Sequence, residues 1–233
     1  MVRLVASPAL TLRACVLAAL AAPGCFDVHL VDPGPAVIDD FDDGDLASAL
    51  PHFHAWESYS FSPNNPDSHD LGLVAGTTNN PFALYLDFRV DDPPDGTQQD
   101  GGAALMIRSD VPWDITSYRA LVFSAKLESG NPALPSNALL YIELGCATAV
   151  AEDGSRRGDM YVVASVNHTA AWQEFRISLV NFATASWLGS IWVAGGPAQC
   201  LQRVDSIRFS VDAHLSDGQS GRGVLTIDNI YVE

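Results

Sequence analysis

The residues best suited to chemistry are aromatic and charged side chains that alternate along two apolar segments. Tyr141 and Glu143 stand two positions apart, and Tyr85, Asp87 and Arg89 follow the same spacing. In a β-strand this spacing places side chains on one face. Aromatic rings can stack on sugar rings, and carboxylate and guanidinium groups can hydrogen-bond to hydroxyls. Both groups therefore predict contacts with a hydroxyl-rich ligand, with packing in the core as the alternative.

Two further aromatic residues, Trp187 and Trp192, lie in a segment between predicted strands. Aromatic residues in connecting segments often serve binding, because such segments run over the surface. We expect Trp187 to contact the same ligand. Burial in the core is again the alternative.

The sequence gives no sign of a catalytic centre. It contains no Gly-x-Ser-x-Gly, no His-Glu-x-x-His and no phosphate-binding loop. His52 and His54 could hold a metal from one strand face, but no third ligand is close in sequence, so a surface pair is the simpler interpretation. A carboxylate pair for glycoside hydrolysis can always be imagined among so many acids. We expect a protein that is not an enzyme.

Composition and charge exclude several partners. The 233 residues are 48% hydrophobic, which is enough for a packed core, and carry a formal charge of −16. Nucleic-acid binding needs clustered cations, and a polybasic membrane patch needs lysines, of which Lys126 is the single example. All 28 acidic residues follow Cys25, and 10 of the 12 basic residues do. Removal of the N-terminal segment would therefore leave a net charge of −18.

Residues 1–24 have the pattern of a secretory signal peptide, in which Arg3 and Arg13 precede a short apolar run at residues 14–22. The segment that ends at Cys25 resembles a bacterial lipoprotein signal, in which the cysteine becomes acylated. Ala22 and Pro23 depart from the usual residues there, and plain signal cleavage is the alternative. We expect residues 25–35 to be a lipidated cysteine and tether. The protein would then be an exported cell-envelope lipoprotein of the outer membrane or cell surface, or otherwise secreted.

The remaining cysteines predict one disulfide. Cys15 lies in the signal and Cys25 would carry the lipid, which leaves Cys146 and Cys200 as an even pair in an exported chain. A thiol nucleophile or zinc site is the weaker interpretation, because no Cys-x-x-Cys or nearby histidine accompanies them.

Hydrophobic residues alternate with polar ones along most of residues 36–233, and no segment shows a capped helical stripe. Ile207, Phe209 and Val211, for example, alternate with serines and an arginine. This period of two is typical of half-buried antiparallel strands. Residues 62–80, rich in proline and asparagine, are expected to form a long loop. About nine or ten strands then predict a single all-β domain over residues 36–233, a two-sheet antiparallel jelly-roll sandwich.

The order of these segments resembles the galactose-binding-like β-jelly rolls, especially the family 11 carbohydrate-binding modules. The segments that carry the resemblance are residues 38–42, 56–60, 114–126, 172–177, 204–209 and 227–232. The resemblance implies that Tyr59 lines a binding cleft. It also departs from the family, since Val163 and Ala164 stand where a tyrosine is expected, and a thinner aromatic stripe favours a shorter or different glycan.

The same resemblance implies that the first and last strands are neighbours and that a structural calcium ion (Ca2+) binds beside them. Asp40, Asp43 and Asp228 would supply carboxylates, with main-chain oxygens completing the shell. Two apolar residues three apart, Ile227 and Ile230, predict a bulge in the last strand. A solvated acidic turn over residues 42–45 is the alternative.

Two functions are consistent with these observations. The first is a non-catalytic carbohydrate-binding module that holds a polysaccharide or oligosaccharide on its concave sheet face, as a monomer attached to the membrane only through lipid. The second is a structural or protein-interaction envelope lipoprotein that uses the same fold without sugar affinity.

Overall fold

The computed structural model describes residues 12–14, 26–28, 34–61, 69–77, 80–91, 100–146, 160–167, 169–184, 196–214 and 220–233. The chain divides into two units, residues 1–34 and 35–233. In the first unit, β1 (Leu12–Ala14) pairs antiparallel with β2 (Phe26–Val28). The predicted signal peptide and Cys25 lie outside the described residues apart from β1, so cleavage and acylation stay predictions.

The second unit is built almost entirely of strands. Its strands are β3 (Ala36–Asp39), β4 (Glu57–Ser60), β5 (His69–Ala75), β6 (Phe82–Asp91), β7 (Asp100–Trp113), β8 (Ala120–Ser129), β9 (Leu139–Cys146), β10 (Met160–Val166), β11 (Gln173–Ser178), β12 (Ala183–Thr184), β13 (Val204–His214) and β14 (Ser220–Val232). A 3-10 turn, η1 (Leu179–Asn181), and a five-residue helix, α1 (Gly196–Cys200), complete the described elements.

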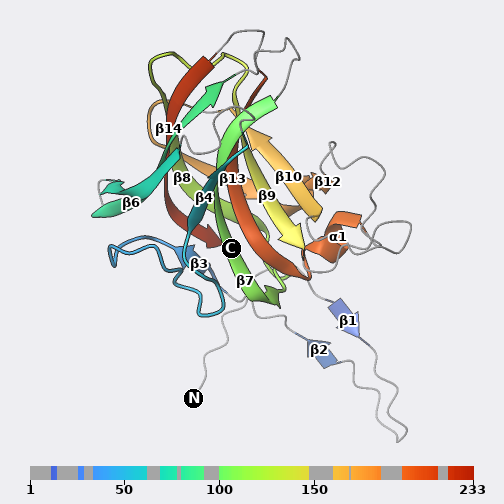
Figure 1. The fold of residues 1–233 in the computed structure, drawn as a ribbon. Helices are drawn as coiled ribbons and strands as arrows, with labels where there is room; N and C mark the ends of the chain where they lie inside the picture. The colour runs from blue at the N-terminus through green and yellow to red at the C-terminus, as the bar shows by residue number, and fades with distance from the viewer. Residues whose placement is uncertain are drawn as a thin grey trace, which may run out of the picture. The chain divides into compact units, whose positions relative to one another are not determined.

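These strands form two antiparallel sheets that stack as a sandwich. One sheet has the order β12-β10-β9-β13-β7-β4, and we call it the first sheet. The second sheet has the order β11-β8-β14-β6-β5, with β3 also paired to β14. Figure 1 shows β7, β13, β9 and β10 side by side in one layer and β8 and β14 in the other. The predicted all-β jelly-roll sandwich is confirmed.

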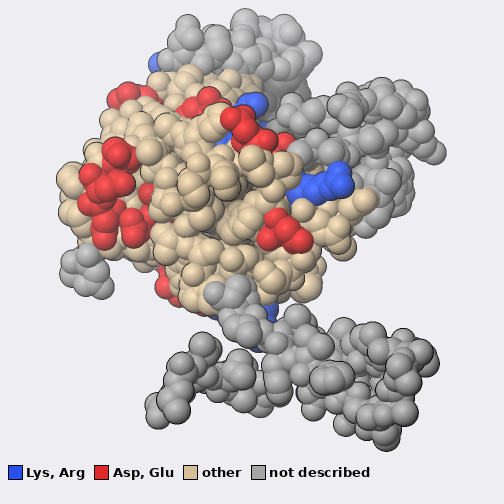
Figure 2. Space-filling view, turned by 90° about the horizontal axis from the view of Figure 1, so that it is seen from below, with Lys and Arg blue, Asp and Glu red and all other residues tan. Residues whose placement is uncertain are grey.

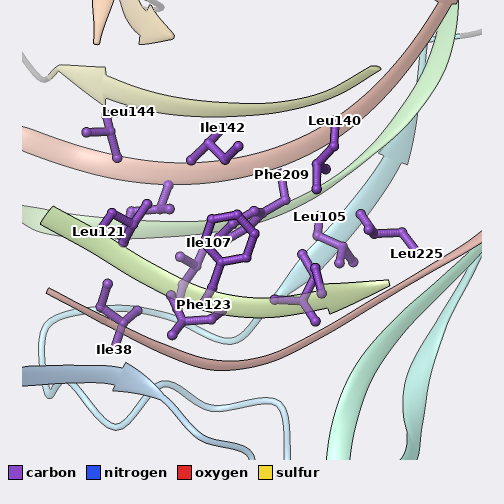
Figure 3. Close-up of a cluster of buried hydrophobic side chains, with 14 of the residues drawn as sticks. Ile38, Leu105, Ile107, Leu121, Phe123, Leu140, Ile142, Leu144, Phe209 and Leu225 are labelled. Atoms are coloured by element: carbon purple, nitrogen blue, oxygen red, sulfur yellow. The ribbon is translucent and has the colours of Figure 1, made fainter. Parts of the chain in front are cut away.

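Alternation along the strands explains why both sheets bury one face. On β13, Ile207 and Phe209 are buried in the core, whereas Arg208 between them is only partly buried. The inward residues of the two sheets meet, with the ring of Phe123 on β8 lying 4.9 Å from that of Phe209, centroid to centroid. Figure 3 shows this layer of leucine, isoleucine and phenylalanine side chains between the sheets. Burial of such apolar area is the main contribution to folding stability.

One predicted loop contains a strand. Residues 62–80 were expected to be a loop, but β5 covers His69–Ala75 and pairs with β6. Leu71 and Leu73 pack partly buried against the core, so burial of two leucines outweighs the turn-forming residues around them. The helix α1 also appears where no helix was expected, and with five residues it is too short to leave a periodic pattern.

The arrangement of β3 and β14 agrees with what was expected from the sequence. β3 pairs with β14, and the register of β14 shifts between Asp228 and Tyr231, which confirms the predicted bulge. Asn229 lies inside this bulge with a φ of 54°, a left-handed conformation that asparagine tolerates better than most residues.

The predicted disulfide between Cys146 and Cys200 is present and joins the end of β9 to α1, with 5.2 Å between the Cα atoms. Both cysteines are buried. Among the described residues, no helix is both long and apolar enough to cross a membrane. Figure 2 shows red acidic side chains outnumbering blue basic ones on the face seen there, with several acids gathered in one patch.

Candidate functional site

The outer face of the first sheet carries a continuous row of side chains across its strands. Tyr59 on β4 lies opposite Ala104 on β7, Ala104 opposite Ser210 on β13, and Ser210 opposite Tyr141 on β9. A parallel row next to it holds Glu57, Met106, Arg208, Glu143 and Val163 in the same strand order, ending on β10. Because these residues alternate with core residues such as Leu105, Ile142 and Phe209, both rows face away from the core.

The strands that carry this outer face are curved. In Figure 3 the strands that carry Ile142 and Phe209 bow toward the core at mid-length, so their outer side is concave. Ala104 and Met106 in the middle of the rows are buried, whereas Tyr59 and Tyr141 keep part of their surface exposed. Three strand spacings separate the two tyrosines, about 14 Å. A ligand lying across the strands could therefore touch both rings.

The centre of the rows is a buried hydrogen-bonded network. The Arg208 Nη1 lies 3.2 Å from the Glu143 Oε2, and the Ser210 hydroxyl donates to the other Glu143 oxygen. Glu143 is only 4% exposed. Burial raises the pKa of Glu143, and the Arg208 charge and the Ser210 hydrogen bond act in the opposite direction. The network fixes the acid and the guanidinium together.

Charge on this face is paired. The guanidinium carbon of Arg208 lies 5.4 Å from the centre of the Tyr59 ring, a cation–π contact. Beside the row that contains Glu57, Arg108 Nε lies 3.1 Å from Glu57 Oε1. Each of these arginines thus has an acidic partner on the same face.

The structure brings three of the predicted binding residues together and separates two. Tyr59, Tyr141 and Glu143 share the concave face of the first sheet. Tyr85 and Arg89 lie on β6 of the second sheet, where the Tyr85 hydroxyl donates to Asp70 Oδ2 at 3.0 Å. Trp187 and Trp192 fall outside the described residues.

Sequence reasoning missed Arg208 and Ser210 as site residues. Both stand on the polar side of the alternating segment 206–211, so their outward orientation was predictable. Their partnership with Glu143 depends on the pairing of β13 with β9, a register that no short-range pattern specifies.

The acidic residues predicted to hold calcium lie around the β3–β14 junction. Asp228 is fully buried, and its carboxylate accepts hydrogen bonds from Thr77 N at 3.1 Å and from Asn80 Nδ2 at 2.9 Å. Asp43 instead accepts from the amide of Asp45 at 3.2 Å, within its own turn. Among the residues that the structure describes, no three His, Cys, Asp or Glu side chains stand close enough together to hold a metal ion.

Oxygen atoms nevertheless converge beside Asp228. Asn80 Nδ2 also lies 3.2 Å from the Asp40 carbonyl oxygen and 2.8 Å from Asn229 Oδ1, so three oxygens surround one atom. Phe41, which follows Asp40, has a φ of 56°, an unusual conformation for a bulky residue and one that tends to occur at functional sites. This arrangement supplies carbonyl, amide and carboxylate oxygens, the donors that calcium prefers.

Neighbouring acids add negative potential there. Partial desolvation, followed by the charges of Asp40, Asp228 and Asp43, raises the pKa of Asp42. Asp39 takes no part in the oxygen cluster, since its carboxylate accepts from Phe41 N and from Trp56 Nε1 at 2.9 and 2.8 Å.

Comparison with known proteins supports the fold. No protein-family description matches the chain, and no curated protein is similar in sequence. Among solved structures, the family 11 carbohydrate-binding module of a cellulosomal cellulase from Clostridium thermocellum is 18% identical, with a TM-score of 0.50 over 85% of this chain and 94% of that one.

Two other solved structures have lower scores. A family 11 module from Clostridium thermocellum in complex with a β-1,3-1,4-mixed-linked tetrasaccharide is 17% identical, with a TM-score of 0.49 over 85% of this chain and 94% of that one. An exo-β-agarase is 14% identical, with a TM-score of 0.44 over 84% of this chain and 24% of that one. At 18% identity, the likeness to the module of the cellulosomal cellulase shows a shared β-sandwich fold and no more.

Proposed function

We propose that residues 35–233 form a non-catalytic carbohydrate-binding module and that its glycan lies across the concave outer face of the first sheet. The observation that carries the proposal is the pair of partly exposed tyrosines, Tyr59 and Tyr141, on either side of a floor in which Ala104 and Met106 are buried. Aromatic rings set this way can stack on two sugar units of one chain. The likeness of the fold to carbohydrate-binding modules supports the same function.

The charged network gives the face its hydrogen-bonding groups. Arg208 forms an ion pair with Glu143 and lies against the Tyr59 ring, so its guanidinium has a fixed direction. A guanidinium in this setting can donate to ring and hydroxyl oxygens of a sugar. Prior ordering of Arg208 lowers the entropic cost of binding.

Affinity electrophoresis through gels that contain mixed-linked β-glucan, agarose, xylan or galactomannan tests the proposal. We expect one of these polysaccharides to retard the protein, and Tyr59→Ala and Tyr141→Ala to reduce the retardation at least fivefold, because each loses a stacking ring. Tyr231→Ala is the matched control, since Tyr231 is a partly buried tyrosine of the second sheet. Absence of retardation by all four would favour the envelope lipoprotein without sugar affinity.

We also propose that a calcium ion stabilises the β3–β14 junction. Asp228, the Asp40 carbonyl and Asn229 would supply oxygens, and the oxygen of a rotated Asn80 amide could join them, since amide nitrogen and oxygen exchange places by a flip. The charges of Asp40, Asp228 and Asp43 all raise the pKa of Asp42, so these acids share one region of negative potential.

Thermal unfolding with calcium and with chelator tests the metal. An ion that binds only the folded protein adds RT ln(1 + [L]/Kd) to the free energy of unfolding, where [L] is the free calcium concentration. The melting temperature must therefore rise. We expect Asp228→Asn to lose this calcium-dependent rise and Asp110→Asn, an exposed acid paired with His54, to keep it. A melting temperature that chelator leaves unchanged would refute the calcium proposal without affecting the glycan proposal.

We further propose that the protein is exported and lipid-anchored, as residues 1–35 predict. An acylated Cys25 would attach the module to the envelope through two acyl chains, which suffices for stable anchoring. Mass spectrometry of the protein from its native membrane would detect the lipid on Cys25. An unmodified N-terminus after signal cleavage would indicate plain secretion.

A further inference from the structure

A groove of about 360 Å³ lies on the second sheet, where β5, β6 and β14 run beside residues 131–132. Its polar lining includes Asp70 from β5, Asp87 and Arg89 from β6, and Arg222 from β14. This volume falls within the range of ordinary small-ligand sites. The groove shares no residue with the concave face of the first sheet.

Partners within the protein fix the groove's acids. Asp70 and Asp87 lie directly opposite each other on β5 and β6. The Tyr85 hydroxyl donates to Asp70 Oδ2 at 3.0 Å. Arg222 Nε donates to Asp87 Oδ1 at 2.9 Å, and Arg222 Nη2 donates to the other Asp87 oxygen. Like charges opposite each other on neighbouring strands are destabilising unless compensated, and here each acid has a donor.

The wall beside β14 is also fixed. Arg222 N donates to the Pro132 carbonyl at 2.9 Å, and Gly130 N donates to the Arg222 carbonyl at 2.7 Å. Leu134 N donates to the Ser129 hydroxyl at 2.8 Å, which holds the turn that leads out of β8. The groove is therefore formed before any ligand arrives, as is typical of small-molecule sites.

His69 at the start of β5 also lines the groove. It lies opposite Phe88 on β6, so its side chain is on the core side of the sheet, whereas Asp70 and Asp87 are on the outer side.

The chemistry of the lining selects a class of ligand. Two carboxylates and two guanidiniums balance in charge, so neither a polyanion nor a simple cation is favoured. Neighbouring hydroxyls on a sugar ring can donate to a carboxylate and accept from a guanidinium at the same time. We propose that this groove is a second ligand site, which binds one or two rings of a neutral sugar on the sheet opposite the proposed glycan face.

Backbone amide shifts in 15N-labelled protein test the second site and locate it. The probes are glucose and galactose, each titrated to 100 mM, with betaine at equal osmolality as the control for solution effects. We expect at least one sugar to give saturable shifts at the amides of Asp70, Asp87, Arg222 and Asn131, with a dissociation constant in the millimolar range. Saturable shifts confined to β4, β9 or β13 would place the sugar on the other face and refute the second site.

Two variants assign the effect to the lining. Arg222→Gln removes a charged donor, and Asp70→Asn keeps an oxygen for Tyr85 while removing the charge, so the second is the milder change. Each should weaken the saturable binding about tenfold, the usual effect of losing a charged hydrogen bond. Asp110→Asn, an exposed acid paired with His54 elsewhere, should bind as the parent does. If neither sugar gives saturable shifts at the groove amides, or if both variants bind normally, the second site is refuted.

Discussion

Glu143 combines two properties that conflict at the level of one side chain. It is an acid on the polar face of its strand, yet it is nearly fully buried. Ser210 donates to one of its oxygens and Arg208 forms an ion pair with the other, but the desolvation cost is larger than their help, so the pKa of Glu143 is raised. An acid with a raised pKa at the centre of the proposed binding face links stability to pH.

The sign of that link can be worked out. Since the pKa of Glu143 in the folded protein lies above its ordinary value of 4.5, the folded state holds this proton over a pH window where the unfolded state has lost it. The stabilisation from Glu143 is fully present below pH 4.5 and declines as the pH rises through the folded-state pKa. The free energy of unfolding of the parent protein should therefore fall relative to that of Glu143→Gln as the pH increases.

Urea unfolding of both proteins at several values between pH 4 and 8 measures this difference. Glu57→Gln removes one acid from the same face at an exposed, arginine-paired position, and so separates the effect of burial from that of net charge. A parent-minus-variant difference that stays flat, or that grows with pH, would contradict the assignment.

At the scale of elements, the alternation of apolar residues predicted most strands and the sandwich, because period two directly reflects one buried face. It failed at β5, where two leucines are too few to stand out among prolines and asparagines. It also could not tell which sheet a strand joins. Tyr85 and Arg89 resemble Tyr141 and Glu143 in that each pair places an aromatic and a charged side chain on one face of an apolar strand. However, β6 and β9 belong to different sheets.

Contacts between distant segments explain the rest of the site. Arg208 reaches Glu143 across 65 positions of sequence only because β13 lies between β7 and β9. Asn80 reaches Asp228 because a loop beside β6 meets the bulge of β14. Strand order depends on the packing of the whole domain, so residue spacing alone does not contain it.

The link between β9 and α1 gives a prediction at this scale. The Cys146–Cys200 bridge closes a loop across 54 positions, and removing it restores freedom mainly to the unfolded chain. The variant with both cysteines changed to alanine should lose about 2–4 kcal/mol of unfolding free energy. Urea unfolding measures the loss. Reductant should destabilise the parent and leave the double variant unchanged, and equal stability of the two proteins would contradict the prediction.

The whole molecule carries far more negative than positive charge. The 12 basic residues cannot neutralise 28 acids, and several of them are already paired, as Arg108 is with Glu57 and Arg222 with Asp87. Figure 2 shows acids gathered where few basic side chains lie near them. Such a surface keeps the protein soluble, but repulsion among the acids opposes the compact state.

Salt should therefore stabilise this protein. At 0.01 M ionic strength charges interact over about 30 Å, and at 0.1 M over about 10 Å, so added salt screens the long-range repulsion before it weakens close ion pairs. A gain of about 1 kcal/mol would raise the melting temperature by about 2–4 °C. Scans in chelator, with sodium chloride and potassium chloride from 10 to 300 mM, separate screening from specific ion binding, because screening gives the same rise for both salts. A melting temperature that falls with salt would mean that ion pairs such as Lys126 with Glu128 stabilise the fold more than the excess of acids destabilises it.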